Sequence, residues 1–339
     1  MNAAKIVRAA LGGLAALWLS EAGAEPLKIR ADWAVLPGQF APLIPSVPAY
    51  APNLYRHYGQ SYVVEPMKLK GGGATLQALA LGETDLSTLS PQSLVDGVVN
   101  ARLELRAIAE QISTEVPGYN QTHYWVDKEK IRTIEDLKGK VFAVNALGAN
   151  VDAAARMVMA RHGFTAPRDF SVVEVAFPAQ LATLKAGKVD VAVLVPPFNL
   201  PAEADPGLKP IFSVGDAFGP VETLMWMAKA DFVAAHRAAL IDFLEDNIRM
   251  RRWMLDPKTR PDAVRQLADI SKIPVENLAS WVYTTKDYYY PPDAAIDVPR
   301  LQKNVADMAK VGVVPKAIEV ARYVDLSLVQ EAAARAAKD

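Results

Sequence analysis

The sequence predicts an α/β protein with two similar lobes and a helical C-terminal region. Between residues 27 and 195, short β-branched runs alternate with segments of helical period, which is typical of parallel strands covered by helices. One strand–helix–strand pattern occurs twice, and from Phe232 onward the pattern is mostly helical. The expected strands are residues 27–30, 62–64, 85–89, 105–112, 141–145, 171–175 and 189–195, and the expected helices are residues 75–81, 152–162 and 179–186.

The internal repeat is the strongest of these observations. Val63-Val64-Glu65 recurs as Val172-Val173-Glu174. Five positions of the following helix and strand recur 105 residues later, namely Leu76, Leu79, Gly82, Asp85 and Pro91 as Leu181, Leu184, Gly187, Asp190 and Pro196. The leucines would pack the helix on the sheet, the glycine would take the left-handed position after the helix, and the aspartate would open the next strand.

The repeat divides the chain into lobes. Residues 25–115 and 225–339 are expected to form lobe 1, and residues 116–224 lobe 2, with two hinge segments near 112–124 and 215–225. In open α/β sheets, ligands lie beyond the carboxyl ends of the strands, near helix N-termini. A ligand site is therefore expected between the lobes.

Composition excludes several classes of protein. With 339 residues, 51% of them hydrophobic and 22% charged, the chain is in the globular range rather than disordered or coiled-coil. The 37 Lys and Arg residues nearly balance 38 Asp and Glu residues, so nucleic acid is not expected as a partner. The absence of cysteine removes thiolate metal sites and cysteine nucleophiles, and the sequence predicts no metal and no cofactor.

The N-terminus predicts export. Lys5 and Arg8 precede an apolar run of 11 residues, which ends before the small-residue triplet Ala22-Gly23-Ala24. This is the pattern of a secretory signal peptide over residues 1–24, cleaved after Ala24. The apolar run is shorter than the roughly 20 residues that a spanning helix needs. We therefore expect a mature protein free in the periplasm.

Several loops at strand ends carry candidate ligand-binding residues. Gly72 and Gly73 lie between a strand and a helix, where backbone N–H groups and the positive helix end suit a carboxylate, sulfonate or phosphate. The alternative is a flexible turn without a ligand. Lys70 beside them is a cationic candidate, or a solvated lysine at a strand end. No Lys-Ser/Thr follows the glycines, so this is not a Walker motif.

The other candidates come from the second lobe and from the mirrored strand ends. Asn150 is a candidate either for ligand contact or for capping its helix, and the loop residues after the mirrored strands are alternatively surface turns. Trp33 would stack on a planar ligand or pack in the core. The remaining candidates are Ser90, Gln92, Pro197, Phe198 and Asn199 at the strand ends, Asn145 and Gly148 in the asparagine loop, and Tyr119, Asn120 and His123 where the chain crosses between lobes.

Three stretches carry a resemblance to a known family. They are residues 71–85 (GGGATLQALALGETD), residues 131–145 (IRTIEDLKGKVFAVN) and residues 184–197 (LKAGKVDVAVLVPP). Over most of residues 27–330 the chain resembles the nitrate/sulfonate/taurine class of ABC-transporter substrate-binding proteins, the SsuA/THI5-like group. The resemblance implies a type II periplasmic-binding-protein fold with mixed sheets, a small solute held between the lobes, and delivery of that solute to an inner-membrane ABC permease.

The chain departs from this family after the first strand. Family members have a continuous helix there, whereas this chain has five prolines, at positions 37, 42, 45, 48 and 52. Because proline breaks helix interiors, we expect a loop at this wall of the cleft.

The expected function is solute binding by a monomer, without catalytic residues. The sequence lacks Gly-x-Ser-x-Gly and His-Glu-x-x-His. An enzyme on the same fold and an exported ligand-sensing module are the alternatives. The helix ends, Lys70 and the aromatic candidates favour an aliphatic or aromatic sulfonate or carboxylate as the solute. Nitrate, taurine and a pyrimidine precursor stay open.

Overall fold

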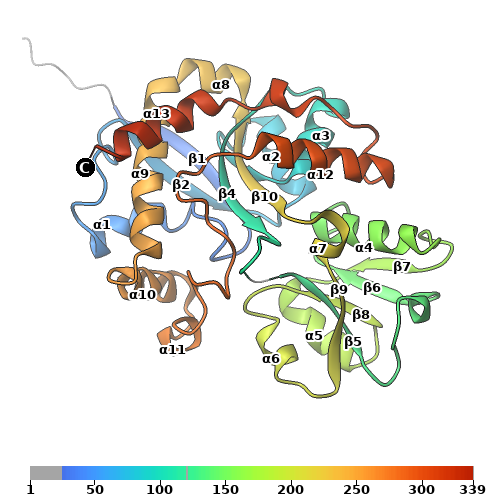
Figure 1. Cartoon of the computed structure of the whole chain (residues 1–339). Helices are drawn as coiled ribbons and strands as arrows, with labels where there is room; N and C mark the ends of the chain where they lie inside the picture. Colours follow the sequence, from blue (N-terminus) through green and yellow to red (C-terminus); the bar gives the residue numbers. More distant parts are fainter. Residues whose placement is uncertain (1–24, 120, 339) are drawn as a thin grey trace, which may run out of the picture.

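The computed structural model describes residues 25–119 and 121–338 (Figure 1). The predicted signal peptide at residues 1–24 and the candidate Asn120 lie outside these residues. Among the described helices, none combines the length and the apolar character needed to cross a membrane.

Lobe 1 is built on two small sheets that adjoin each other. In the first, β1 and β2 are parallel, and in the second, β10 lies antiparallel between β3 and β4. A parallel bridge between Ala31 and Leu86 links β1 to the start of β3, so the strand order across the lobe is β2-β1-β3-β10-β4. The bounds are β1 (Leu27–Trp33), β2 (Tyr62–Lys68), β3 (Ser87–Leu89), β4 (Leu105–Thr114) and β10 (Val221–Lys229).

Lobe 2 contains one five-stranded mixed sheet of order β7-β6-β8-β5-β9. Strand β6 is parallel to β7 and β8, whereas β5 is antiparallel to β8 and β9. The bounds are β5 (His123–Asp127), β6 (Val141–Val144), β7 (Ser171–Glu174), β8 (Val191–Leu194) and β9 (Leu208–Ser213). The fold class is therefore the predicted one, two α/β lobes with mixed sheets.

The internal repeat is confirmed by the strand orders, because β2, β1 and β3 of lobe 1 correspond to β7, β6 and β8 of lobe 2. Gly82 and Gly187 follow the equivalent helices with φ of +73° and +68°. The equivalent aspartates bind the backbone of the neighbouring strand. Asp85 accepts a hydrogen bond from a backbone N–H of β1 at 2.9 Å, and Asp190 accepts one from a backbone N–H of β6 at 2.9 Å. The repeated Gly-x-x-Asp sequence thus ends a helix and fastens the next strand to its parallel neighbour.

Helices cover both faces of the sheets, and the C-terminal region is mostly helical (Figure 1). Long α9 packs against α13 in lobe 1, and α12 packs on α3 and β10. The longer helices are α2 (Gly73–Leu81), α3 (Pro91–Val99), α4 (Asn150–Arg161), α5 (Phe177–Lys185), α9 (Arg237–Leu255), α10 (Arg260–Ser271), α12 (Val298–Lys310) and α13 (Leu326–Ala336). The shorter ones are α1 (Val47–Tyr50), α6 (Leu200–Glu203), α7 (Val214–Phe218), α8 (Ala230–Ala235), α11 (Val275–Leu278) and the 3₁₀ turns η1 (Ile44–Ser46), η2 (Glu135–Leu137) and η3 (Val320–Tyr323).

Buried side chains form cores on both faces of the lobe 2 sheet. Along β5, Tyr124 and Val126 belong to a core shared with α4 and with lobe 1, whereas Trp125 belongs to a smaller core on the opposite face. This is the alternation that a strand covered on both sides requires. A further core in lobe 1 joins β1 and β2 to α9, α10 and α13.

The segment after β1 is a series of turns with the short elements η1 and α1, which confirms the expected loop in the proline-rich region. Helix α3 and strands β5, β9 and β10 were not predicted. Ser90 and Pro91 carried a signal for α3, because serine at the N-cap and proline at the first helical position are common helix starts.

Candidate functional site

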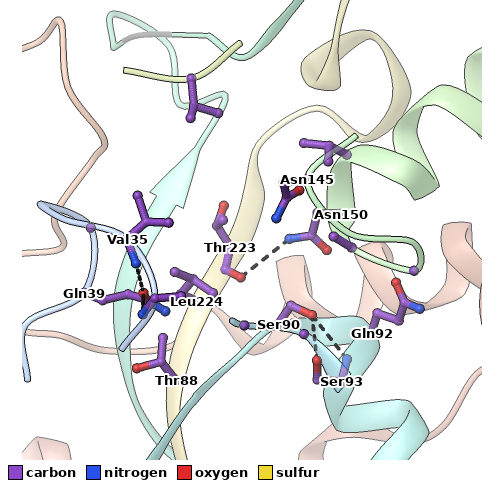
Figure 2. Close-up of a pocket in the computed structure, with 18 of the residues that line it drawn as sticks. Val35, Gln39, Thr88, Ser90, Gln92, Ser93, Asn145, Asn150, Thr223 and Leu224 are labelled. Carbon is purple, nitrogen blue, oxygen red and sulfur yellow. Dashed lines mark hydrogen bonds between the residues drawn. The ribbon is translucent and has the colours of Figure 1, made fainter. Parts of the chain in front are cut away.

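A cavity of about 280 Å³ lies between the lobes (Figure 2). Lobe 1 contributes the loop after β1, the glycine loop (residues 71–73) and the start of α3. Lobe 2 contributes the asparagine loop (residues 145–150), which runs into the start of α4. Seven of the predicted ligand-binding residues line this cavity: Gly72, Gly73, Ser90, Gln92, Asn145, Gly148 and Asn150.

Four helices of nine or more residues start at the cavity. Their first turns supply Gly73 of α2, Gln92 of α3, Asn150 of α4 and Phe177 of α5 to the lining. The first N–H groups of a helix have no partner within it, and that end of the helix dipole is positive. The cavity therefore has a positive potential of backbone origin, contributed by both lobes.

The glycine loop and the asparagine loop face each other across the cavity. Gly72 has φ +56°, and a Cβ built on it would lie 3.8 Å from the Cβ of Ala146 in lobe 2. Gly148 has φ +76°, and a Cβ there would lie 2.5 Å from Nε2 of Gln92 in lobe 1. Glycine at both positions lets the backbones of the two lobes approach closely.

Asn150 does not cap its helix, contrary to one of its two predicted roles. The N-cap of α4 is Ala149, and Asp152 instead accepts the N–H of Gly148 at 2.8 Å. The Asn150 side chain reaches toward β10, a strand of the lobe 1 sheet that begins within the residues 116–224 expected for lobe 2, and its Nδ2 donates to the carbonyl of Thr223 at 3.5 Å (Figure 2). Its Oδ1 is buried without a hydrogen-bond partner, as is Oε1 of Gln92.

Hydroxyl and amide groups on the lobe 1 side are held in place by local hydrogen bonds. The Ser90 hydroxyl caps α3 by accepting the N–H of Ser93 at 3.2 Å, and it lies 3.2 Å from the Ser93 hydroxyl. Oε1 of Gln39 accepts the N–H groups of Ala34 and Val35 at 2.5 and 2.7 Å, which shapes the loop after β1. These local hydrogen bonds therefore hold the lining groups in position.

Side-chain charges in the lining are few. Among the described residues that line the cavity, Lys70 is the only cation and Asp96 the only anion. Burial raises the pKa of Asp96, although Gln92 and Asn100 donate hydrogen bonds to it. Behind the lining, burial raises the pKa of Asp32 to about 7, and Thr88 donates its N–H to this carboxyl. The helix ends are therefore a larger source of positive potential than the side chains.

Six predicted residues lie away from the cavity lining. Trp33 is covered by Lys68, whose Nζ lies 4.9 Å from the ring centre. Tyr119 packs edge-on against Tyr289 at 5.0 Å, and His123 packs against Trp125. Pro197, Phe198 and Asn199 lead into α6, and of the described residues between β8 and α6 only Val195 lines the cavity.

Sequence patterns carried little signal for the apolar part of the lining. Leu76, Ile112 and Leu224 come from a helix and two strands of lobe 1, and Tyr288 comes from the C-terminal segment. Tyr288 is placed by Asp287, which accepts the backbone N–H of Tyr288 at 2.8 Å. Such residues meet only through tertiary packing.

One cluster of potential metal ligands, apart from the cavity, occurs among the described residues: His57, Asp242 and Glu245. The two ring nitrogens of His57 face different carboxylates, Nδ1 toward Asp242 at 3.8 Å and Nε2 toward Glu245 at 3.2 Å. Arg335 pairs with Asp242 and Arg249 with Glu245. We interpret the cluster as ion pairing that fastens the loop before β2 to α9.

Comparison with known families matches residues 38–268 to the model of the NMT1-like family. The chain belongs to the NMT1-like family. Among curated proteins, no sequence matches this NMT1-like protein.

Solved structures with the same fold include three solute-binding proteins, two of them described as periplasmic. The alkanesulfonate-binding protein SsuA from Xanthomonas axonopodis pv. citri, bound to MOPS, is 17% identical, with a TM-score of 0.67 over 89% of this chain and 99% of the other. The aliphatic sulphonate-binding protein SsuA from Escherichia coli is 16% identical, with a TM-score of 0.63 over 90% and 99%. The nitrate-binding protein NrtA from Synechocystis PCC 6803 is 16% identical, with a TM-score of 0.67 over 92% and 89%. These likenesses confirm the predicted periplasmic-binding-protein fold.

Proposed function

We propose that this NMT1-like protein is a periplasmic receptor that captures a small organic anion between its lobes and delivers it to an ABC permease of the inner membrane. The observation that carries the proposal is the cavity of about 280 Å³ between the lobes, at which four helix N-termini from both lobes meet. Contacts from both lobes form only when the lobes are together, so a bound solute favours the closed state.

The lining supports a solute with two kinds of surface. Helix N-termini and Lys70 suit a carboxylate or sulfonate head, since both provide N–H donors and positive potential. Leu76, Ile112 and Leu224 suit an apolar body, which would gain about 25 cal/mol for each Å² of surface removed from water. Nitrate would leave the apolar part of the lining without contacts, so an alkyl or aryl sulfonate or carboxylate is favoured over it.

The lining also supports binding without catalysis. Histidine, the most common general base, is missing from the described residues that line the cavity. Ser90 and Ser93 hydrogen-bond to each other and to the start of α3, as helix-capping residues do. We propose a monomer, exported through the signal peptide and free in the periplasm.

A solute panel tests this proposal. Protein of residues 25–339, unfolded and refolded to remove co-purified solutes, would be titrated with alkanesulfonates of increasing chain length, the matching carboxylates, the matching primary alcohols and nitrate. Thermal shift and tryptophan fluorescence would report binding. We expect saturable binding of at least one organic anion, with the matching alcohol at least tenfold weaker.

Two results would contradict the proposal. Equal binding of anion and alcohol would show that the helix ends do not select charge. Failure of every solute, together with native mass spectra that show no co-purified small molecule in protein that was never unfolded, would argue against solute capture itself.

A further inference from the structure

Two crossover segments join the lobes, and they run side by side beneath the cavity. The first follows β4 and is described over residues 115–119 and 121–122, and the second, residues 214–220, precedes β10. The N–H of Val214 donates to the carbonyl of Thr122 at 2.9 Å, and the hydroxyls of Thr114 and Thr223 lie 2.8 Å apart. All four of these residues also line the cavity, so the crossover segments and the adjoining ends of β4 and β10 form its floor.

Glu115 lies at the point where the first segment leaves lobe 1. Its carboxylate bonds to both segments: Oε1 accepts the N–H of Thr122 at 2.8 Å, and Oε2 accepts the N–H of Gly215 at 3.0 Å. The residue is 4% exposed. A single buried side chain thus connects lobe 1, the start of β5 and the start of α7.

Two backbone features show that this connection is specific. Glu115 has φ +61°, a left-handed conformation that is uncommon for residues other than glycine and is often found at functional positions. A Cβ on Gly215 would lie 2.9 Å from Oε2 of Glu115, so glycine at 215 permits the close approach of the carboxylate.

We propose that Glu115 is a positioning residue that ties the two crossover segments together, and that its carboxyl group thereby sets the balance between closed and open lobes. The proposal deepens the proposed function, because it names how lobe closure at that cavity is controlled. Glu115 acts through the cavity floor rather than on the solute, since it is not among the lining residues.

The surroundings of Glu115 make this balance dependent on pH. Burial raises the pKa of Glu115 to about 7, even though the N–H donors of Thr122 and Gly215 lower it. Asp216 on α7 raises the pKa further through its negative charge. The other titratable or charged groups nearby are Tyr124 and His123 on β5, whose pKa values burial raises and lowers respectively, and Arg161 on α4, which donates to the carbonyl of Asp216.

The direction of the pH effect follows from linkage. Glu115 in this arrangement holds a proton more tightly than a solvated glutamate, so acid favours the tied arrangement over any arrangement that exposes the carboxyl group. If opening restores an ordinary pKa, the ratio of tied to open lobes falls up to about tenfold between pH 6 and pH 8.

Inter-lobe distances measured without any solute test the proposal. Because the sequence contains no cysteine, Glu83→Cys after α2 in lobe 1 and Lys188→Cys after α5 in lobe 2 would accept spin labels at exposed positions. Pulsed EPR at pH 6 and pH 8 would report the distance distribution. We expect the short-distance population to fall with rising pH in the wild type, and E115Q to lose this response.

A second variant keeps the test decisive if E115Q does not fold. In Gly215→Ala the new methyl group would push the Glu115 carboxylate away from the second crossover segment, and we expect this variant to reduce the pH response at least threefold. Gly207→Ala is the matched control, because a Cβ there would lie 3.2 Å from Oδ1 of Asp205, away from the crossovers, and it should respond like the wild type.

Two results would overturn the proposal: a wild type whose distances do not change with pH, or a full response in E115Q or Gly215→Ala. Since no solute is added, these outcomes are independent of the solute panel. Solute binding with pH-independent distances would refute the role of Glu115 alone, and a pH response without solute binding would refute the proposed function alone.

Discussion

Replacing Gly148 by alanine would test whether the closed arrangement is the solute-bound one. The new Cβ would lie 2.5 Å from Nε2 of Gln92, which belongs to the opposite lobe, so Gln92 must move whenever the lobes close. Moving it breaks the hydrogen bond from Gln92 to Asp96, now 3.4 Å long, a loss of about 1 kcal/mol. This cost arises only in the closed state, so we expect the dissociation constant to rise about fivefold.

The same variant carries a second cost that a matched control can separate. Gly148 has φ +76°, and an alanine in the left-handed region costs about 1–2 kcal/mol of stability whether the lobes are open or closed. Gly163 has φ +81° at the end of α4 with open space around it. Gly163→Ala should therefore lower the melting temperature as much as Gly148→Ala does, without changing affinity.

Calorimetric titration with the tightest-binding member of the solute panel, and differential scanning calorimetry without it, would measure both effects. The reasoning would be refuted if Gly148→Ala bound the solute with wild-type affinity. It would be refuted equally if Gly163→Ala weakened binding to the same extent.

Three further changes test the lining and the core. Asn150→Ala removes an amide that reaches from lobe 2 to lobe 1, and we expect affinity to fall by about 1 kcal/mol, roughly fivefold, in the same titration. Trp33→Phe should change affinity less than about twofold, since Trp33 lies outside the lining. A larger loss of affinity would show that Trp33 contacts the solute. Burial beside Glu110 raises the pKa of Glu222 to about 10, above its unfolded value, so the stability it contributes is complete in acid and is lost as pH rises toward 10. Glu222→Gln should remove part of that loss in melting temperatures measured from pH 5 to pH 10, and an unchanged profile would contradict the raised pKa.

Local sequence patterns predicted the recurring strands and the two loops that face the cavity, but not the residues that line or support it from distant parts of the chain. The repeat predicted the strand–helix–strand unit that recurs in each lobe, because Gly82 and Asp85 carry local backbone roles that their equivalents repeat. The glycine and asparagine loops were found because strand ends and helix starts are local features too. Tyr288 and Glu115 reach the cavity and its floor through contacts between distant segments, which periodicity does not encode.

The aromatic residues near the first crossover segment were predicted to line the cavity, but they lie outside its lining. His123 and Tyr119 were predicted as lining because of where they occur along the chain. In the structure, His123 begins β5, a strand covered on both faces, so the alternation of the strand and not the distance from the hinge sets where its side chain points. Tyr119 precedes β5 and packs against Tyr289.

Strand β10 lies between β3 and β4, although it follows all of lobe 2 in the chain. Lobe 2 has every strand of its sheet by Ser213, whereas the second sheet of lobe 1 lacks its middle strand until Lys229 is available. During synthesis from the N-terminus, we therefore expect lobe 2 to fold first, and lobe 1 to fold only after β10 has been added, although lobe 1 begins earlier in the sequence. A fragment that stops before β10 should contain a folded lobe 2 and an unfolded lobe 1, and the cavity between the lobes should form only after β10 has been synthesised.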